Sequence, residues 1–443
     1  MYFEGLSFVS YKKILSILIA LCACRGMAAG EFSFRGGAEE TTAALQSALD
    51  AGGLVRVMPG DYEITGLTLK SGTTLHLEKG ARLLSQRDKT GFTGPAKRAI
   101  LFAEDASDVA VVGAGEIDGR GGAAVIMGHE DERQRGLYFI RCKNVRLEGF
   151  TLRNPDMWSC YFRECDGVTV RKMTVHSHAN YNNDGLDIEA KNVLVEDCDI
   201  DSDDDAICFK SDNPGFVVEN CEVRNCRISA NCNYIKCGTS SYGTFRNLSI
   251  HDCTFREGTA SKFWDWKKHV PGAKTSAGGI SGIALEVVDG GVMENVVCRD
   301  IVMESGVQTP IFIRQGSRHT GARPSVPKGI LIENVTATSC CRIASSVTGV
   351  AGRRPSDITI RNVKLALTGG GTAEDVAKPV PEQEAGYPEN RMFKGALPAY
   401  GFYVRHADNV RFENVELTLL EPDARPAFFT DDAAVSLRNC RFE

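Results

Sequence analysis

The chain has 443 residues and a formal net charge of −6. This acidity argues against a nucleic-acid partner, which would favour a basic stripe. It does not exclude an acidic polysaccharide, because a few cations near a site can dominate the local field. The chain has 45 glycines and only 3 tryptophans, which is typical of short strands joined by tight turns.

The N-terminus has the pattern of an export signal. Lys12 and Lys13 precede the apolar run Ile14–Ala23, and small residues follow up to Gly30. A run of 10 apolar residues is too short to cross a bilayer. We therefore predict a leader over residues 1–29 and an exported mature protein, periplasmic or secreted, without a membrane span. The segment Leu21–Cys24 resembles a bacterial lipoprotein box, so lipid attachment at Cys24 stays an alternative.

The first element expected in the mature chain is a helix over residues 39–51. Thr41 or Thr42 is the predicted N-cap, and Ala44, Leu45, Ala48 and Leu49 fall on one face. Short alternating segments follow directly, bounded by Pro-Gly, Gly or Ser-Gly turns. Such a helix would plug the first coil of a solenoid, which otherwise exposes its apolar interior.

A strand-like unit then recurs along the chain. Copies start at residues 144, 167, 192 and 215, so the intervals are 23, 25 and 23 residues. One strand signature per unit of 20 to 30 residues predicts a right-handed parallel β-helix. We therefore expect an all-β, single-domain solenoid over residues 30–443. Residues 256–281 and 368–398 break the rhythm and are predicted surface loops, the first a candidate border of a substrate cleft.

Most of the 14 cysteines outside the leader occur at one place in the repeats. A ladder of buried thiols explains that placement better than a disulfide framework, although one or two disulfides elsewhere stay open. The sequence has no paired CxxC with histidines at ligand spacing. The repeat cysteines are Cys142, Cys165, Cys198, Cys221, Cys226, Cys253, Cys298 and Cys440.

Two acidic groups stand out against this repeat. Asp184 lies in a polar turn at residues 182–187, and Asp204 and Asp205 follow 20 and 21 residues later. A separation close to one repeat would stack the two groups on neighbouring coils, about 4.8 Å apart in backbone. Carboxylates that converge in this way suit glycosidic-bond hydrolysis, in which one acts as acid and others activate water. A solvated acidic edge and a loose calcium site are the alternatives.

The turn Asn-Asn-Asp-Gly-Leu-Asp, followed by Asp-Asp-Ala-Ile within β-helical coils, resembles the polygalacturonases of glycoside hydrolase family 28. The resemblance implies a pectin-lyase-like solenoid, an inverting glycosidase for O-glycosyl bonds, and a pectic polysaccharide or oligosaccharide as substrate. It implies Asp204 as general acid, with Asp184 and Asp205 activating the water. No cofactor or metal is implied, and we expect a monomer.

Two segments depart from the family pattern. The usual Gly-His-Gly is replaced by residues 232–239, which contain no histidine, and the usual Arg-x-Lys by residues 282–287, which contain no cation. Other residues must then hold the sugar. The substrate-binding candidates are Asn182, Asp187, Lys210, Lys236 and Arg314.

Histidine and tryptophan residues near the predicted site have both a structural and a functional interpretation. His176 and His178 are read as polar strand residues rather than acid–base groups. Trp158, Trp264 and Trp266 could stack on sugar rings, and the last two could equally anchor their loop. Two other functions stay open: a polysaccharide lyase on the same scaffold, and a non-catalytic carbohydrate-binding β-helix.

Overall fold

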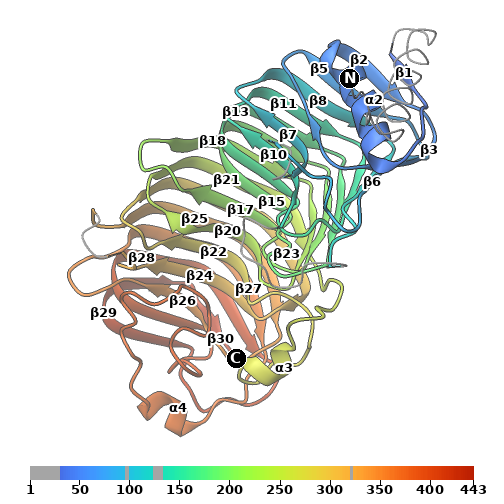
Figure 1. The fold of residues 1–443 in the computed structure, drawn as a ribbon. Helices are drawn as coiled ribbons and strands as arrows, with labels where there is room; N and C mark the ends of the chain where they lie inside the picture. Colours follow the sequence, from blue (N-terminus) through green and yellow to red (C-terminus); the bar gives the residue numbers. More distant parts are fainter. Residues whose placement is uncertain (1–29, 95–98, 123–132, 320–322) are drawn as a thin grey trace, which may run out of the picture.

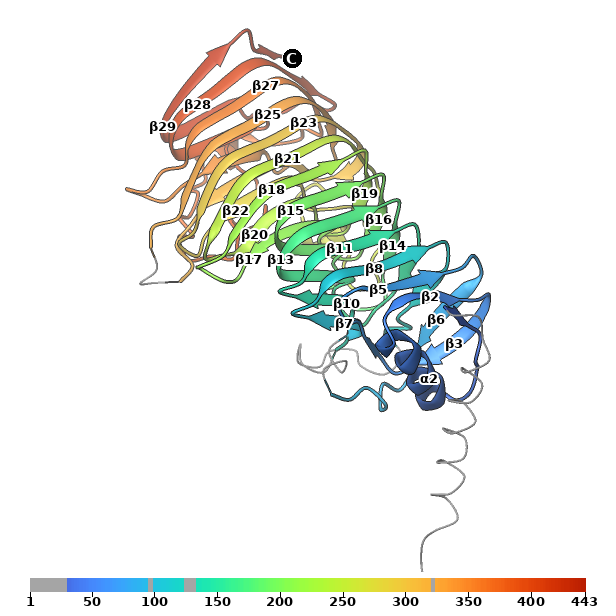
Figure 2. The same cartoon turned by 90° about the horizontal axis from the view of Figure 1, so that it is seen from above.

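The computed structural model describes residues 30–94, 99–122, 133–319 and 323–443. The predicted leader, including Cys24, lies outside these residues. The described chain winds into an elongated right-handed parallel β-helix, with the N-terminal helix at one end and the last strands at the other (Figures 1 and 2). The predicted fold class is therefore confirmed. In the described part of the chain, no helix is long and apolar enough to cross a bilayer.

Three parallel sheets run along the solenoid. Sheet 1 carries the acidic turns. Its strands are β4 (Leu67–Thr68), β7 (Ala99–Glu104), β10 (Arg135–Ile140), β13 (Cys160–Arg171), β15 (Leu186–Glu196), β17 (Ile207–Ser211), β20 (Asn233–Ser241), β22 (Ser281–Val287), β24 (Thr309–Gln315), β26 (Ser345–Thr348) and β28 (Phe402–Leu419).

Sheet 2 begins with the first strand of the described chain. Its strands are β1 (Glu31–Phe32), β2 (Gly53–Val57), β5 (Thr73–Leu77), β8 (Ser107–Gly113), β11 (Lys143–Glu148), β18 (Val217–Arg224), β21 (Thr244–Phe255), β23 (Val292–Val307), β25 (Val326–Ser339), β27 (Ser356–Leu367) and β29 (Phe428–Arg438), and the long strands β13, β15 and β28 bend into it from sheet 1.

Sheet 3 is made of shorter strands. They are β3 (Gly60–Ile64), β6 (Ala81–Ser85), β9 (Glu116–Asp118), β12 (Thr151–Arg153), β14 (Thr174–Ser177), β16 (Asp199–Ser202) and β19 (Arg227–Ala230), and the sheet continues in the C-terminal ends of β21, β23, β25, β27 and β28, ending at β30 (Arg441–Phe442).

The structure has more than one strand per repeat, which corrects the prediction of one strand per unit. The unit that starts at residue 192 bends midway, between β15 and β16, where Asp197 has a φ of 56°. The unit expected at residue 215 falls largely within β18 and is out of register with it, since Val193 pairs with Cys221. Asparagines hold a second corner, because this residue tolerates positive φ better than most. The side-chain amide of Asn220 donates to Asn192 at 3.2 Å, and that of Asn247 donates to Asn220 at 3.2 Å. The recurring asparagines are thus explained by a hydrogen-bonded ladder along the solenoid.

The interior is one continuous apolar core, and aromatic side chains stack in it from coil to coil. The ring of Phe139 lies 5.5 Å from that of Phe162, with planes 8° apart. All 14 cysteines of the described chain are free thiols, and most are buried. The thiol ladder is therefore confirmed. The disulfides left open for other positions do not occur among the described residues.

The solenoid begins under helix α2 (Ala38–Asp50), whose buried face includes Ala44, Leu45 and Leu49. The predicted caps were wrong, because the helix starts earlier, at the N-cap Gly37. The carboxylate of Glu40 accepts the Gly37 N–H at 3.1 Å and satisfies the free end of the helix. The amphipathic plug itself is confirmed.

A second apolar cluster lies outside the solenoid, over the C-terminal half of sheet 1. It joins outward side chains of that sheet, such as Ala284, Phe312 and Tyr403, to the two irregular segments. The 256–280 loop contributes Trp266 from helix α3 (Trp266–His269). The segment between β27 and β28, which holds helix α4 (Ala373–Ala377), contributes Met392 and Phe393. Both segments therefore pack on this face.

Candidate active site

Strand register brings the acidic turns together on the outward side of sheet 1. Leu186 of β15 pairs with Ile207 of β17, which places Asp184 next to Asp205 on the following coil. The backbone hydrogen bond from Gly185 N–H to the carbonyl of Asp205, at 2.9 Å, fixes this register. Asp204 adjoins the pair, so the three aspartates converge as their spacing predicts.

Asp204 and Asp205 are neighbours with opposite electrostatic surroundings. Burial and the adjacent Asp205 raise the pKa of Asp204 to about 6. Burial acts on Asp205 too, but its pKa is lowered overall, since Lys236 Nζ lies 3.0 Å from one oxygen. The other oxygen accepts the backbone N–H and the side-chain amide of Asn233, at 3.0 and 2.7 Å. Thus Asp204 holds a proton in mild acid while Asp205 is ionised.

Asp184 and Asp187 share the second ammonium group. Lys210 Nζ lies 3.0 Å from Asp187 and 3.8 Å from Asp184. Burial raises the pKa of Asp187 to about 6 against the effect of Lys210. Burial and the neighbouring charges of Asp187 and Asp204 raise the pKa of Asp184 as well. Four carboxyl groups thus share two ammonium groups, which favours retention of protons in the cluster.

A tyrosine stands beside the Asp205 ion pair. Lys236 Nζ lies 3.5 Å from the hydroxyl of Tyr387 and 5.6 Å from its ring centre. Tyr387 is 56% exposed as a residue. One coil further, Glu286 is fully buried, and burial raises its pKa to about 8. On this side of the aspartates, Lys236 is thus already paired with Asp205, and the carboxyl group of Glu286 stays protonated below about pH 8.

Residues 380–390, here called the strap, cross sheet 1 just beyond Lys236. The guanidinium of Arg314 donates to the carbonyls of Glu382 and Gln383 at 3.2 and 3.0 Å. Ser317 N–H donates to the carbonyl of Glu384 at 2.8 Å. The amide of Asn390 donates to the carbonyl of Ile280 at 2.8 Å. These anchors tie the strap across β22 and β24.

Arg314 is consequently not where a substrate-binding residue is expected. Its side chain is 1% exposed, and besides the strap it binds the carbonyl of Gly349 at 3.0 Å. The guanidinium organises the strap instead of facing the aspartates. Asn182, in contrast, is exposed and lies at the cluster, with its amide 3.5 Å from Asp204. Its carbonyl oxygen accepts from Arg133 at 3.0 Å.

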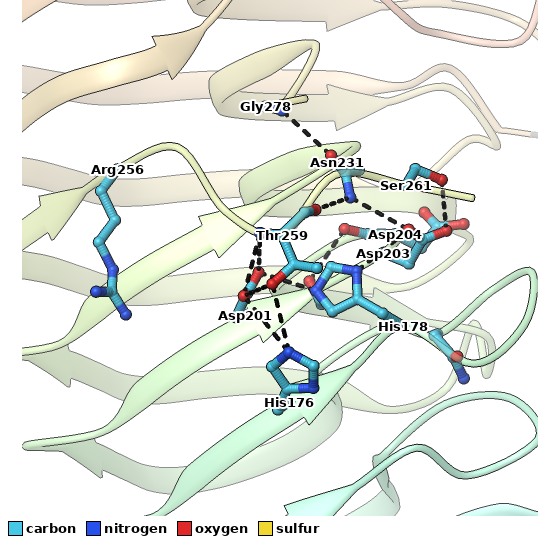
Figure 3. Close-up of polar contacts among 12 residues, drawn as sticks. His176, His178, Asp201, Asp203, Asp204, Asn231, Arg256, Thr259, Ser261 and Gly278 are labelled. Atoms are coloured by element: carbon cyan, nitrogen blue, oxygen red, sulfur yellow. Dashed lines mark hydrogen bonds and ion pairs between the residues drawn. The ribbon is translucent and has the colours of Figure 1, made fainter. Parts of the chain in front are cut away.

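His178 is a buried member of an ion-pair cluster, whereas the sequence predicted only a polar strand residue. Its ring lies between Asp201 and Asp203, with nitrogen–oxygen distances of 2.9 and 3.2 Å (Figure 3). Burial favours the neutral ring, yet the two carboxylates raise the pKa of His178 to about 9. The spacing of alternate polar residues on paired strands β14 and β16 is the sequence signal that could have indicated this ion pair.

The same carboxylates hold the 256–280 loop. Asp201 accepts from the hydroxyl of Thr259 at 2.7 Å, and Asp203 from Ser261 at 3.0 Å (Figure 3). In the same loop, Phe263 packs on Tyr181, the residue before the 182–187 turn, with ring centres 4.3 Å apart. The loop therefore borders the site. Trp266 is 1% exposed and anchors the loop.

Trp158 adjoins the aspartates from the preceding coil. Its ring lies 4.8 Å from Lys210 Nζ and 4.8 Å from the guanidinium of Arg135 on β10. Arg135 is not among the site residues predicted from the sequence. The only sequence signal would have been its position one repeat before Trp158, since Leu137 pairs with Cys160.

Among the described residues, two groups have enough potential ligands for a metal ion. His176, His178 and Asp201 form one, and Asp204, Asp205 and Cys232 form the other. In the first, His178 already uses both ring nitrogens on carboxylates. In the second, burial raises the pKa of the Cys232 thiol well above its usual range, with Asp204 and Asp205 adding to the effect. A protonated thiol beside Asp204 suits a hydrogen-bond donor better than a metal ligand.

Known proteins with similar sequences are pectin-degrading enzymes by name. The family "Glycosyl hydrolases family 28" matches residues 56–257. "Probable polygalacturonase" from Arabidopsis thaliana is 26% identical over 300 residues, which are 65% of this chain and 59% of the relative. "Probable rhamnogalacturonase B" from Aspergillus terreus is 27% identical over 213 residues, 46% of this chain and 36% of that protein. The chain thus spans less than two thirds of these relatives.

Solved structures give the same fold. An exopolygalacturonase from Thermotoga maritima superposes with a TM-score of 0.63 at 19% identity, covering 86% of this chain and 88% of that one. A family 28 exopolygalacturonase from Yersinia enterocolitica gives 0.64 at 16% identity, with coverages of 90% and 75%. The family match over residues 56–257 and the similarity to the polygalacturonase and rhamnogalacturonase relatives support membership of glycosyl hydrolase family 28, and the solved structures support the parallel β-helix fold.

Proposed function

We propose that the protein hydrolyses O-glycosidic bonds of galacturonate-containing pectic polysaccharide or oligosaccharide, with inversion at the anomeric carbon. The observation that carries the proposal is the split between two adjacent carboxyl groups. The pKa of Asp204 is raised to about 6, whereas that of Asp205 is lowered. A glycosidase needs this pair of states, because one group donates a proton while another activates water.

In this mechanism Asp204 protonates the leaving oxygen. Asp205, ionised by Lys236 and Asn233, takes the proton of the attacking water. Asp184 lies beside Asp205 and helps to hold that water. A general acid and base typically contribute a factor of about 10² to 10⁴ each. The step uses side chains alone and requires no cofactor.

Substrate contacts are assigned to groups around the aspartates. Asn182 is exposed at the cluster and can reach a sugar hydroxyl. Asp187, Lys210 and Lys236 are paired with one another or with the catalytic groups. We therefore infer that the lysines mainly set the charge of the acids, and that they contact the sugar only through their remaining protons.

The position of the strap supports attack at a chain end. It crosses sheet 1 directly after Lys236, so a glycan lying along the sheet has no continuation towards β22 and β24. The two solved structures described above are both named exopolygalacturonases. We propose that a terminal sugar lies against the strap and that the rest of the glycan extends towards β13 and β10.

Export and assembly are proposed on sequence grounds. Residues 1–29 would be removed as a leader, leaving residues 30–443 as one exported hydrolase unit that works as a monomer. N-terminal sequencing of the secreted protein tests the first point, and light scattering tests the second. A leader that stays attached, or a stable dimer, would contradict them.

The activity is tested with purified protein on polygalacturonan, rhamnogalacturonan and their oligosaccharides. We expect saturated products of inverted anomeric configuration, which NMR detects. Chromatography should show short products from the first minutes, because attack at a chain end releases short sugars from the start. Products that absorb in the ultraviolet would indicate a lyase, because elimination leaves a double bond. A carbohydrate-binding protein would give no products, and substitution of Asp204 by Asn would leave its binding unchanged.

A further inference from the structure

In the part of the chain that the structure describes, the guanidinium group of Arg135 is surrounded by aromatic rings rather than by acids. It lies over three aromatic rings, 5.0 Å from the centre of Tyr138, 4.8 Å from Trp158 and 5.9 Å from Tyr161. Within the described residues it forms no ion pair, and its buried Nε atom has no hydrogen-bond partner. Neighbouring arginines on the outer surface behave differently, since Arg141 pairs with Glu104 and Asp105 at 2.8 Å.

The strand register places Arg135 in line with the catalytic groups. Pairing of Leu137 with Cys160, and of Cys160 with Leu186, sets Arg135, Trp158 and Asp184 at the same position on successive coils. Asp205 follows at this position on the next coil. Coils stack about 4.8 Å apart, so the backbone of Arg135 lies about 10 Å from that of Asp184. A short oligosaccharide spans this distance.

The other cations near the site are occupied. Lys210 is shared by Asp184 and Asp187, and Lys236 is bound to Asp205. Arg133 donates to the carbonyl of Tyr181 and to Asn182. Among the cations around the aspartates, Arg135 therefore has the most unused donor capacity, and a carboxylate matches its planar fork.

We propose that Arg135 and Trp158 form a subsite that binds the carboxylate of a uronate residue, two coils before Asp184. The guanidinium is held flat by the aromatic rings, so it is already oriented when the anion arrives. Trp158 touches both Arg135 and Lys210 and offers an apolar surface to the sugar between the subsite and the aspartates. The inference rests on the proposed function, because it assigns a place to that substrate.

The test compares Arg135→Gln and Arg135→Lys with a matched control, Arg146→Gln. Arg146 is half exposed on β11 and pairs with Glu148 at 3.1 Å. For oligogalacturonates we expect Arg135→Gln to raise KM by about tenfold to a hundredfold with a smaller change in kcat, since a charged hydrogen-bonded contact is lost. Arg135→Lys should lie between, and the control should match wild type. With methyl-esterified oligosaccharides all four proteins should have similar KM values.

A structural role and the proposed function can be separated from this result. If Arg135 only packs on its rings, the variants will lower the melting temperature and leave KM for the acidic substrate at the wild-type value, which overturns the subsite. If the wild type cleaves no pectic glycan, binding of oligogalacturonate by calorimetry decides. If Arg135→Gln binds oligogalacturonate more weakly than the wild type, the subsite is supported although the proposed function is wrong. No binding, or binding equal in both proteins, overturns the subsite.

Discussion

The two sides of the aspartate cluster along the solenoid differ in charge and in cover. Towards the C-terminus, Lys236 is paired with Asp205, Glu286 is buried, and the strap crosses the sheet. Towards the N-terminus, Trp158 continues the line of Asp184, as does Arg135, which forms no ion pair with any described residue. From this difference we expect an anionic glycan to be favoured on the N-terminal side only. The same repeat builds both sides, and the outward side chains alone create the difference.

The largest expected effect on activity comes from substitution of Asp204, which lies between the two sides. Asp204→Asn removes the donated proton with little change in shape, and we expect kcat to fall about 10³-fold while substrate binding persists. Asp197→Asn is the matched control, since Asp197 lies exposed at a corner with a positive φ that asparagine tolerates. Steady-state kinetics measure both variants. Equal activity of Asp204→Asn and the control would remove the general acid from the mechanism.

The pH dependence follows from the same asymmetry. Burial and Asp205 raise the pKa of Asp204 to about 6, so the fraction in the acid form declines above that pH. We expect kcat to fall about tenfold per pH unit on the alkaline limb. The pKa of Asp205 is lowered, so the acid limb should lie below the range in which an ordinary aspartate titrates. A profile that is flat from pH 5 to 8 would contradict the assignment.

Substitution of Lys236 and of Lys210 compares how the two ammonium groups affect the pKa of Asp205. Lys236→Met leaves the buried Asp205 without its cation, and we expect unfolding free energy to fall by about 3 kcal/mol. The pKa of Asp205 should rise as well, which moves the acid limb of the rate profile upward. Lys210→Met should move that limb less, because Lys210 lowers the pKa of Asp205 only by its nearby charge, and its direct contacts are with Asp184 and Asp187. Chemical denaturation and kcat profiles measure both, and identical profiles would contradict the pairing.

Much of this arrangement could be predicted from sequence, because repeat length and register decide which residues stack. The coils and the convergence of Asp184 with Asp205 follow from the spacing. Arg314 could not be placed, since its partners are carbonyl groups of a strap far along the chain. Arg135 was missed for the converse reason. It stands out because no described residue forms an ion pair with it, and the sequence does not reveal which charged groups will lack a partner.

The loop that borders the site depends on a charged histidine. The pKa of His178 is raised to about 9 by Asp201 and Asp203, above the usual value near 6.5. This stabilisation is therefore fully present below pH 6.5 and is lost as pH rises through about 9. A shift of this size corresponds to stability on the order of 3 kcal/mol. His178→Gln should remove most of that pH dependence in thermal unfolding, whereas His251→Gln, at a distant corner, should keep it.

The smallest expected effect concerns the strap. Tyr387 is 56% exposed, and its hydroxyl lies 3.5 Å from Lys236, so a terminal sugar held near Asp205 would meet its ring. An aromatic contact contributes about 0.5–1.5 kcal/mol, and Tyr387→Ala should raise KM a few-fold for every oligosaccharide, acidic or esterified. Phe442→Ala, 42% exposed at the far end of the solenoid, should change nothing. Because the Arg135 effect depends on substrate charge and the Tyr387 effect does not, one substrate series distinguishes the two sides. A charge-dependent loss in Tyr387→Ala would place the uronate carboxylate against the strap instead.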